Sequence, residues 1–209
     1  MKNALAVLSL ALVGAVASVP AFAGSVYSNG PLNGQNLGYT INSGYSVSDS
    51  FTLSSTTTVT SVDFGEWFFP GDSSVSVDWS IGTTPFSGST STAATTGVFD
   101  FNNQYGFDVY TESFSTGDVI LGPGTYYLTL SDAATAEGNP AYWDMNNGPS
   151  IAYESAIGNL NGVNGAGTNS ETFDINGTSG PVVPEPSSLL LMGSGLVSFA
   201  GMMRRKLKA

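Results

Sequence analysis

The stretch that most clearly indicates the fold class is Val75-Ser76-Val77-Asp78-Trp79-Ser80-Ile81. Apolar and polar side chains alternate along its whole length. Because successive side chains of a β-strand point to opposite faces, the apolar residues share one face and the polar residues share the other. The stretch therefore predicts an antiparallel strand that is buried on one face and exposed on the other.

The same alternation recurs along the middle of the chain. Tyr126, Leu128 and Leu130 share one face of a second strand, and Gly122-Pro123-Gly124 supplies a tight turn before it. Weaker strand candidates, rich in Ser, Thr, Val, Tyr and Phe, lie at residues 37–41, 45–53, 58–67, 98–101, 108–114, 141–144, 151–154 and 171–175. Many short strands of this kind predict an all-β fold, either an antiparallel β-sandwich or a jelly roll. Residues 159–169, rich in Gly and Asn, predict a loop before the last strand.

The first 23 residues have the order of an export signal. A positive start at Lys2 precedes an apolar stretch over residues 4–19, and Ala21-Phe22-Ala23 has the small-x-small pattern that signal peptidase accepts. We therefore predict a signal-peptide helix over residues 1–23, cleaved after Ala23, and export by the secretory pathway. A membrane anchor is the alternative, but the apolar stretch is at the short end for crossing a bilayer.

One domain is expected between the two ends. We predict a body over residues 24–176, a linker at 177–183 and a tail at 182–209; the body is long enough for a single core. The basic residues all lie at the ends, as Lys2, Arg204, Arg205, Lys206 and Lys208, whereas fifteen of the sixteen carboxylates lie in the body. An acidic surface without cations repels phosphate backbones, so we exclude nucleic acid as a partner.

The side chains that most enzymes use are missing from the body. The chain has no Cys or His, and the body has no Lys or Arg. Nucleophile–histidine pairs, zinc sites and phosphate-binding lysines are therefore excluded. Carboxylates alone could support a glycosidase, but no pair of them stands out. We expect a protein that is not an enzyme and requires no cofactor; calcium is the candidate ion, because it would relieve repulsion among the carboxylates.

A few residues of the body have the chemistry of ligand sites. Asp144 with Asn146, and Asp100 with Asn102, place oxygen atoms at the close spacing of calcium loops, although neither pair completes the loop pattern and turn formation explains both. Trp143 follows a turn signal and lies among polar residues, so it is a candidate platform for a sugar ring. Packing of Trp143 in the core is the alternative.

The C-terminal tail has three parts in a fixed order. Val183-Pro184-Glu185-Pro186 is followed by a segment without charge, and the chain ends in a basic cluster formed by Arg204, Arg205, Lys206 and Lys208. We predict a short transmembrane helix at about residues 187–203, stopped by the basic cluster on the cytoplasmic side. Because this helix is short for a bilayer, it suits temporary retention better than permanent anchorage.

These three parts resemble the PEP-CTERM sorting domain of Gram-negative bacteria, which is also labelled an ice-binding protein C-terminal domain. The resemblance implies that an exosortase removes the tail and that Pro184, Glu185 and Pro186 are its recognition residues. It covers only the tail, so the ice-binding label does not transfer to the body. A plain C-terminal anchor that stays in place is the alternative.

The resemblance also suggests a role. The implied route passes through the inner membrane transiently and ends at the cell surface or outside the cell, with signal peptidase and exosortase as partners. Residues 79–82, 124–130 and 141–144 are similar to the β-sandwich bodies that such proteins often carry. We expect a structural or interaction protein linked to exopolysaccharide or biofilm; the alternative is a carbohydrate-binding module, with or without calcium.

Overall fold

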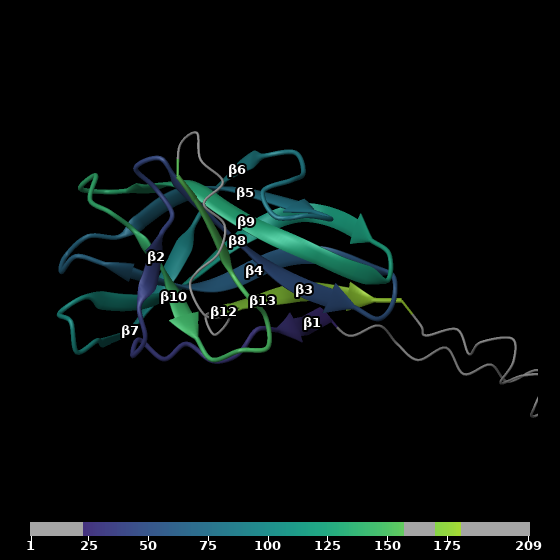
Figure 1. Cartoon of the computed structure of the whole chain (residues 1–209), viewed down its shortest axis with the longest axis horizontal. Coiled ribbons are helices and arrows are strands. Elements are labelled where there is room, and N and C mark those ends of the chain that lie inside the picture. The colour runs from purple at the N-terminus through teal and green to yellow at the C-terminus, as the bar shows by residue number, and fades with distance from the viewer. Residues whose placement is uncertain (1–22, 157–169, 181–209) are drawn as a thin grey trace, which may run out of the picture. The chain divides into compact units, whose positions relative to one another are not determined.

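The computed structural model describes residues 23–156 and 170–180 of the 209-residue chain. This part consists of strands and turns, with no helix (Figure 1). The strands are β1 (Ala23–Ser28), β2 (Gly38–Thr40), β3 (Tyr45–Leu53), β4 (Thr57–Phe68), β5 (Ser74–Gly82), β6 (Ser91–Ala94), β7 (Thr96–Asn102), β8 (Asp108–Leu121), β9 (Gly124–Thr135), β10 (Tyr142–Asn146), β11 (Tyr153–Ala156), β12 (Ser170–Glu171) and β13 (Phe173–Ser179). The all-β prediction is confirmed. The helices expected at the two ends and the loop expected at 159–169 lie outside the described residues.

The strands form two antiparallel sheets. The eight-stranded sheet runs in the order β1-β13-β4-β10-β12, with β2 beside β10, β8 also paired with β4, and β7 beyond β8. Strand β4 is its centre, because β8 pairs along one edge while β13 and then β10 share the other. The five-stranded sheet runs in the order β11-β3-β9-β5-β6. Strands β1 and β13, the first and last of the described residues, are therefore neighbours in one sheet (Figure 1).

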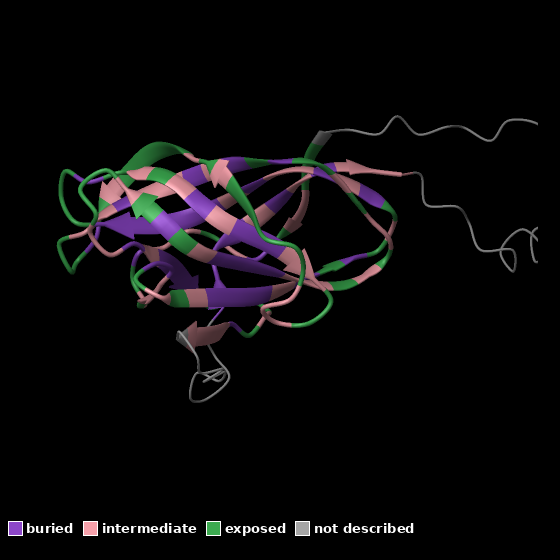
Figure 2. Ribbon diagram, turned by 90° about the horizontal axis from the view of Figure 1, so that it is seen from above, coloured by how far each residue is buried: buried purple, intermediate pink, exposed green. Residues whose placement is uncertain are grey.

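The two sheets share one hydrophobic core. It contains Val47, Phe51, Leu53, Val77, Trp79, Leu128 and Leu130 from the five-stranded sheet, and Val59, Val62, Phe64, Phe68, Phe114, Trp143, Phe173 and Ile175 from the eight-stranded sheet. Aromatic rings join the layers: Phe51 meets Phe173 with ring centroids 6.3 Å apart. Figure 2 shows the buried residues running along the strands, and the exposed ones at the turns and along parts of several strands. This two-layer packing fits the expected β-sandwich.

Strand β5 follows the predicted alternation over most of its length. Val77 and Trp79 are buried in the core, whereas Val75, expected on the same face, is 51% exposed. The pairing of β5 with β9 shifts in register between Ser74 and Ser76 and again before Asp78. Such a bulge changes the direction of neighbouring side chains. The prediction for Val75 is therefore wrong because an irregularity in pairing interrupts the two-residue period.

Strand β13 extends further than expected. Gly177, Thr178 and Ser179 pair with residues 57–59 of β4, so the linker predicted at 177–183 is wrong over these three positions. The glycine that suggested a linker has another role here. A Cβ atom at Gly177 would lie 2.1 Å from the carbonyl O of Thr58, so the close approach of two backbones requires glycine within the strand.

Candidate functional site

Trp143 is buried, whereas a platform for a sugar ring must be exposed to solvent. Its side chain is 0% exposed, and its indole Nε1 donates a hydrogen bond to the carbonyl O of Thr172 at 2.8 Å. The ring packs edge-on against Phe64 and tilted against Phe173. The platform prediction for Trp143 is therefore wrong: β10 turns this residue towards the core, where its single polar atom is satisfied by the backbone.

Asp144 and Asn146 connect loops rather than leave oxygen atoms free for an ion. The Asp144 carboxylate accepts hydrogen bonds from Trp67 Nε1 at 2.7 Å, the Thr172 hydroxyl at 2.8 Å and two backbone N–H groups of residues 33–34. Burial raises the Asp144 pKa, and these hydrogen bonds oppose the rise. Asn146 Nδ2 donates to the carbonyl O of Asn29 at 2.9 Å. Both side chains are thus occupied in holding the segment after β1 against β10.

Asp100 and Asn102 both contact strand β8. Asp100 accepts a hydrogen bond from the Thr111 hydroxyl at 2.9 Å, and Asn102 Nδ2 donates to the Asp108 carboxylate. These are ordinary cross-strand contacts of β7. Across residues 23–156 and 170–180, no group of three or more Asp or Glu side chains is arranged to hold a metal ion. The geometry of these residues therefore gives the calcium candidates no support.

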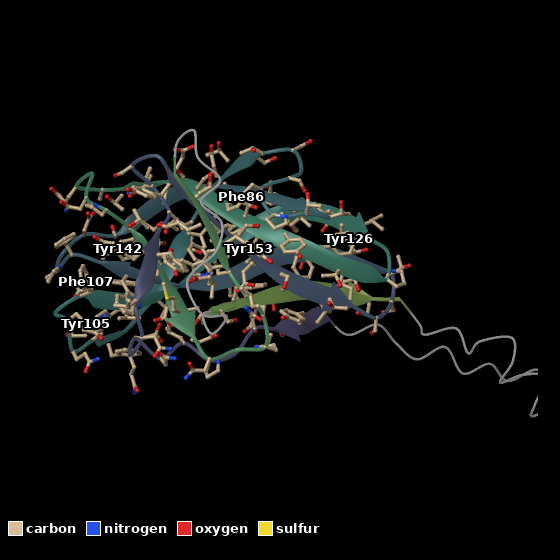
Figure 3. All side chains as sticks on the ribbon, in the orientation of Figure 1. Phe86, Tyr105, Phe107, Tyr126, Tyr142 and Tyr153 are labelled. Atoms are coloured by element: carbon tan, nitrogen blue, oxygen red, sulfur yellow. The ribbon has the colours of Figure 1, made fainter. Side chains whose placement is uncertain are left out.

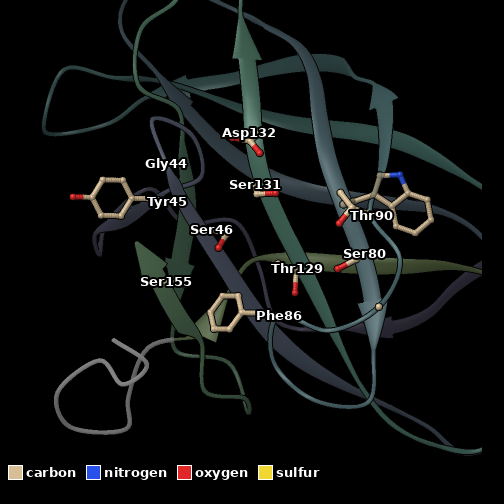
Figure 4. Close-up of a pocket in the computed structure, with 12 residues that line it drawn as sticks. Gly44, Tyr45, Ser46, Ser80, Phe86, Thr90, Thr129, Ser131, Asp132 and Ser155 are labelled. Atoms are coloured by element: carbon tan, nitrogen blue, oxygen red, sulfur yellow. The ribbon is translucent and has the colours of Figure 1, made fainter. Parts of the chain in front are cut away.

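The structure instead reveals a hollow of about 420 Å³ on the five-stranded sheet (Figure 4). We call it the hydroxyl hollow, because its lining includes the hydroxyl side chains of Ser46, Ser80, Thr90, Thr129, Ser131 and Ser155. The lining also includes the side chains of Tyr45, Phe86 and Asp132. The residues come from β3, β5, β9, β11 and the loop after β5, which are widely separated in the sequence.

The floor of the hydroxyl hollow is the outer face of three neighbouring strands. Ser46 of β3 pairs with Ser131 of β9, and Thr129 of β9 pairs with Ser80 of β5. Along β9 these polar residues alternate with Leu128 and Leu130, which are fully buried in the core. The two-residue period that builds the core on one face therefore builds a surface of hydroxyl groups on the other.

One wall is the loop between β5 and β6, which folds back over the sheet. The Ser80 hydroxyl donates to the carbonyl O of Ser87 at 3.1 Å, and the Phe86 N–H donates to the Ser48 hydroxyl at 3.4 Å. Gly88 has φ +104°, and a Cβ there would lie 2.5 Å from the carbonyl O of Ile81. The loop is thus held close to the sheet by glycine and by hydroxyl contacts, and it presents the Phe86 ring beside the hydroxyl groups (Figure 4).

Strained backbone is concentrated around the hydroxyl hollow. Among the described residues, the non-glycine positions with positive φ are Ser43, Phe86, Asp118 and Asp132. Phe86 at 58° and Asp132 at 45° line the hollow, and Ser43 precedes Gly44, which also lines it. Such conformations cost about 1–3 kcal/mol each and cluster at binding sites. The strained backbone at Phe86 and Asp132 therefore marks this hollow as the candidate site.

A separate group of carboxylates is buried and faces no solvent. Glu66 of β4 is 0% exposed and Glu112 of β8 is 1% exposed; neither oxygen of Glu66 accepts a hydrogen bond of ordinary geometry. Burial raises the pKa of Glu112 to about 7. Burial and the nearby Glu112 raise the Glu66 pKa well above its ordinary value, and the Ser74 hydroxyl opposes this only in part. Glu171, also fully buried, has its pKa raised by burial and by Asp49.

The described residues do not include the tail or most of the signal peptide. The predicted sorting, membrane-stop and cleavage residues that therefore lie outside them are Pro184, Glu185, Pro186, Arg204, Arg205, Lys206, Lys208 and Ala21. Within the described part, no helix has the length and hydrophobicity needed to cross a membrane.

Comparison with known proteins concerns the tail alone. Residues 182–206 match the family model of the PEP-CTERM protein-sorting motif. The match includes the Pro-Glu-Pro sequence and the basic cluster as far as Lys206. No curated protein sequence matches the chain. The motif implies export towards the cell surface through an exosortase, as the sequence predicts.

Proposed function

We propose that the protein is a non-catalytic component of the cell surface or extracellular matrix whose β-sandwich body binds polysaccharide at the hydroxyl hollow. The observation that carries this proposal is the coincidence, in one hollow, of strained backbone at Phe86 and Asp132 with a floor of hydroxyl groups. The sorting motif supports the location, since export towards the surface brings the body to extracellular polysaccharide.

The chemistry of the hollow suits a sugar. A pyranose ring has apolar C–H faces and hydroxyl edges, so it needs both a ring to stack on and groups that donate and accept hydrogen bonds. Phe86 and the 41% exposed Tyr45 supply aromatic surface, while Ser46 and Ser131 supply hydroxyls that both donate and accept. No change of protonation is needed for any of these contacts.

The charge of the body favours neutral glycans. Asp132 is the carboxylate of the hollow's lining, and the body has fifteen carboxylates and no cationic side chain. Uronate or sulfate groups would therefore be repelled at long range and would find no Arg or Lys on arrival. We propose neutral polysaccharide as the ligand, and we place the role in exopolysaccharide or biofilm. Calcium is not part of the proposed contact.

The same composition supports a binding role over catalysis. Two of the carboxylates with raised pKa values, Glu66 and Glu112, are buried in the body rather than exposed in the hollow, so they cannot act there as a glycosidase pair. A substrate in the hollow would contact hydroxyls and rings instead. We therefore propose that the bound glycan leaves unchanged.

The test is binding of the exported protein to an array of neutral and anionic glycans, with calcium and with a chelator. Phe86→Ala removes the ring of the hollow, and Phe99→Ala is the matched control, because Phe99 is a 48% exposed ring on β7. A ring contact is worth about 0.5–1.5 kcal/mol, so Phe86→Ala should weaken binding by about two- to tenfold. Equal binding by both variants, or binding to anionic glycans alone, would refute the proposal.

A further inference from the structure

A second polar hollow lies on the other sheet. Its volume is about 470 Å³, and it is bounded by the segment between β1 and β2 and by the turn between β7 and β8. We call it the amide pocket, because its side chains include Asn33, Gln35, Asn102, Asn103 and Gln104. Amide groups both donate and accept hydrogen bonds and carry no charge.

The two segments that form the amide pocket are joined by specific contacts. Gln104 Nε2 and the Tyr105 hydroxyl both donate to the carbonyl O of Gln35, at 3.2 and 3.3 Å. Gly34 has φ +59°, and a Cβ there would lie 2.5 Å from the Phe101 ring. The segments therefore approach closely because glycine permits it, and the pocket is a built feature of the fold.

One donor of the pocket lining has no acceptor. The Asn103 side chain is only 9% exposed. Its Oδ1 accepts from the N–H groups of Tyr105 and Phe107, each at 3.0 Å, but its buried Nδ2 has no hydrogen-bond partner. Buried polar groups in native proteins are nearly always paired. This unpaired donor belongs to a residue that lines the pocket, although the atom itself has almost no accessible surface.

An aromatic ring stands beside the pocket. Tyr105 is 50% exposed and stacks on Trp67 with centroids 5.9 Å apart and an interplanar angle of 27°. Trp67 is itself almost fully buried and is fixed by its hydrogen bond to Asp144. The Tyr105 ring is thus supported on one face by a rigid neighbour while half of its surface remains open. Figure 3 shows Tyr105 well separated from Phe86 of the hydroxyl hollow.

We propose that the amide pocket with Tyr105 is a second site for a neutral glycan, so that one protein molecule holds two polysaccharide segments and crosslinks them. The inference rests on the proposed function, because it assigns the same ligand class to a separate site. Binding must expose the Asn103 Nδ2 donor, which has almost no accessible surface in the free protein, to a sugar oxygen, and Tyr105 takes the apolar face of the ring. Asp108, which binds Asn102, disfavours anionic sugars here as well.

The experiment measures stoichiometry and crosslinking with neutral glucan, mannan and galactan oligosaccharides and polymers. Native mass spectrometry of the full exported chain counts bound oligosaccharides, and light scattering follows the association of soluble polymer. The variants are Phe86→Ala in the hydroxyl hollow, and Tyr105→Ala and Asn103→Asp in the amide pocket. Asn103→Asp keeps the acceptor Oδ1 and removes the unpaired donor. Phe99→Ala is the control, and circular dichroism verifies folding.

Two oligosaccharides should bind per wild-type chain, occupancy of one of the two sites should fall in each single-site variant, and crosslinking should be strongest for the wild type and Phe99→Ala. If Tyr105→Ala and Asn103→Asp fold, bind two oligosaccharides and crosslink polymer, the second site is refuted while the hydroxyl hollow stands. If Phe86→Ala leaves binding unchanged and the amide-pocket variants abolish it, the hydroxyl hollow is refuted and the amide pocket is left as a single site, which ends the crosslinking proposal. Failure of all three glycans to bind would overturn both sites.

Discussion

The folded protein should lose stability as the pH rises, and replacing Glu112 with Gln should make this loss smaller. The Glu112 side chain is 1% exposed and has one unpaired oxygen in the core. Burial raises its pKa from 4.5 to about 7. Since each pH unit between the unfolded and folded pKa values corresponds to about 1.4 kcal/mol, ionisation of Glu112 should destabilise the folded state by about 3 kcal/mol.

The direction of the effect follows from proton binding. Between the unfolded and folded pKa values, the folded protein binds more protons at Glu112 than the unfolded chain does. The contribution to stability is therefore fully present below the unfolded value of 4.5 and is lost as the pH rises through about 7. Glu66 and Glu171, whose pKa values are raised further, add to the loss in the wild type. Glutamine has no proton to lose, so the Glu112 contribution disappears from the variant.

The assay is thermal unfolding of the exported protein at about pH 4 and about pH 8, which lie on either side of both pKa values, so the contrast should approach the full Glu112 contribution. For a domain of this size 1 kcal/mol shifts Tm by about 2–4 °C, so the Tm difference between the two pH values should be about 6–12 °C smaller in Glu112→Gln than in the wild type. Glu137→Gln is the matched control, because Glu137 is exposed. An identical pH dependence in Glu112→Gln and the wild type would refute the assignment.

Two further predictions concern the tail and the core. Intact mass of the protein exported by its native host should show loss of residues 1–23 and a tail cut near Pro184 to Pro186, and Glu185→Ala should retain the C-terminus through Ala209; an uncut wild-type tail would indicate a plain anchor instead. Trp143→Ala should destabilise the body by about 3–5 kcal/mol in chemical unfolding, because it empties a fully buried site. At a temperature where the variant is folded, its glycan affinity should match the wild type, and a selective loss of binding would contradict the structural role assigned to Trp143.

Local alternation was enough to predict the class of fold. Val77 and Trp79 in β5, and Leu128 and Leu130 in β9, point to the core as their spacing requires. The turn at residues 122–123 separates β8 from β9 as expected. Strands β1 and β6 were not predicted, because neither has a long alternating pattern, and the single strand expected at 171–175 is divided between β12 and β13. Their positions depend on partners far away in the sequence.

The ligand sites could not be predicted in the same way. Trp143 lies in a polar sequence, yet the pairing of β10 with β4 and β2 turns the residue inward, and no local pattern reveals that orientation. The hydroxyl face of β9 was visible as the polar half of its alternation at Thr129 and Ser131. Its meeting with Ser46 and Ser80 depends on the order of β3, β9 and β5, which tertiary pairing alone decides.

The place of β13 in the eight-stranded sheet has a consequence for the timing of folding. Strand β13 pairs with β1 on one side and with β4 on the other, so the first strand of the body finds its partner only after almost the whole body has been made. A chain exported from its N-terminus would keep that part of the sheet open until Ser179 has crossed, with only the tail still to follow. Contacts of such long sequence separation form slowly. The eight-stranded sheet should therefore be completed only when the sorting motif reaches the membrane.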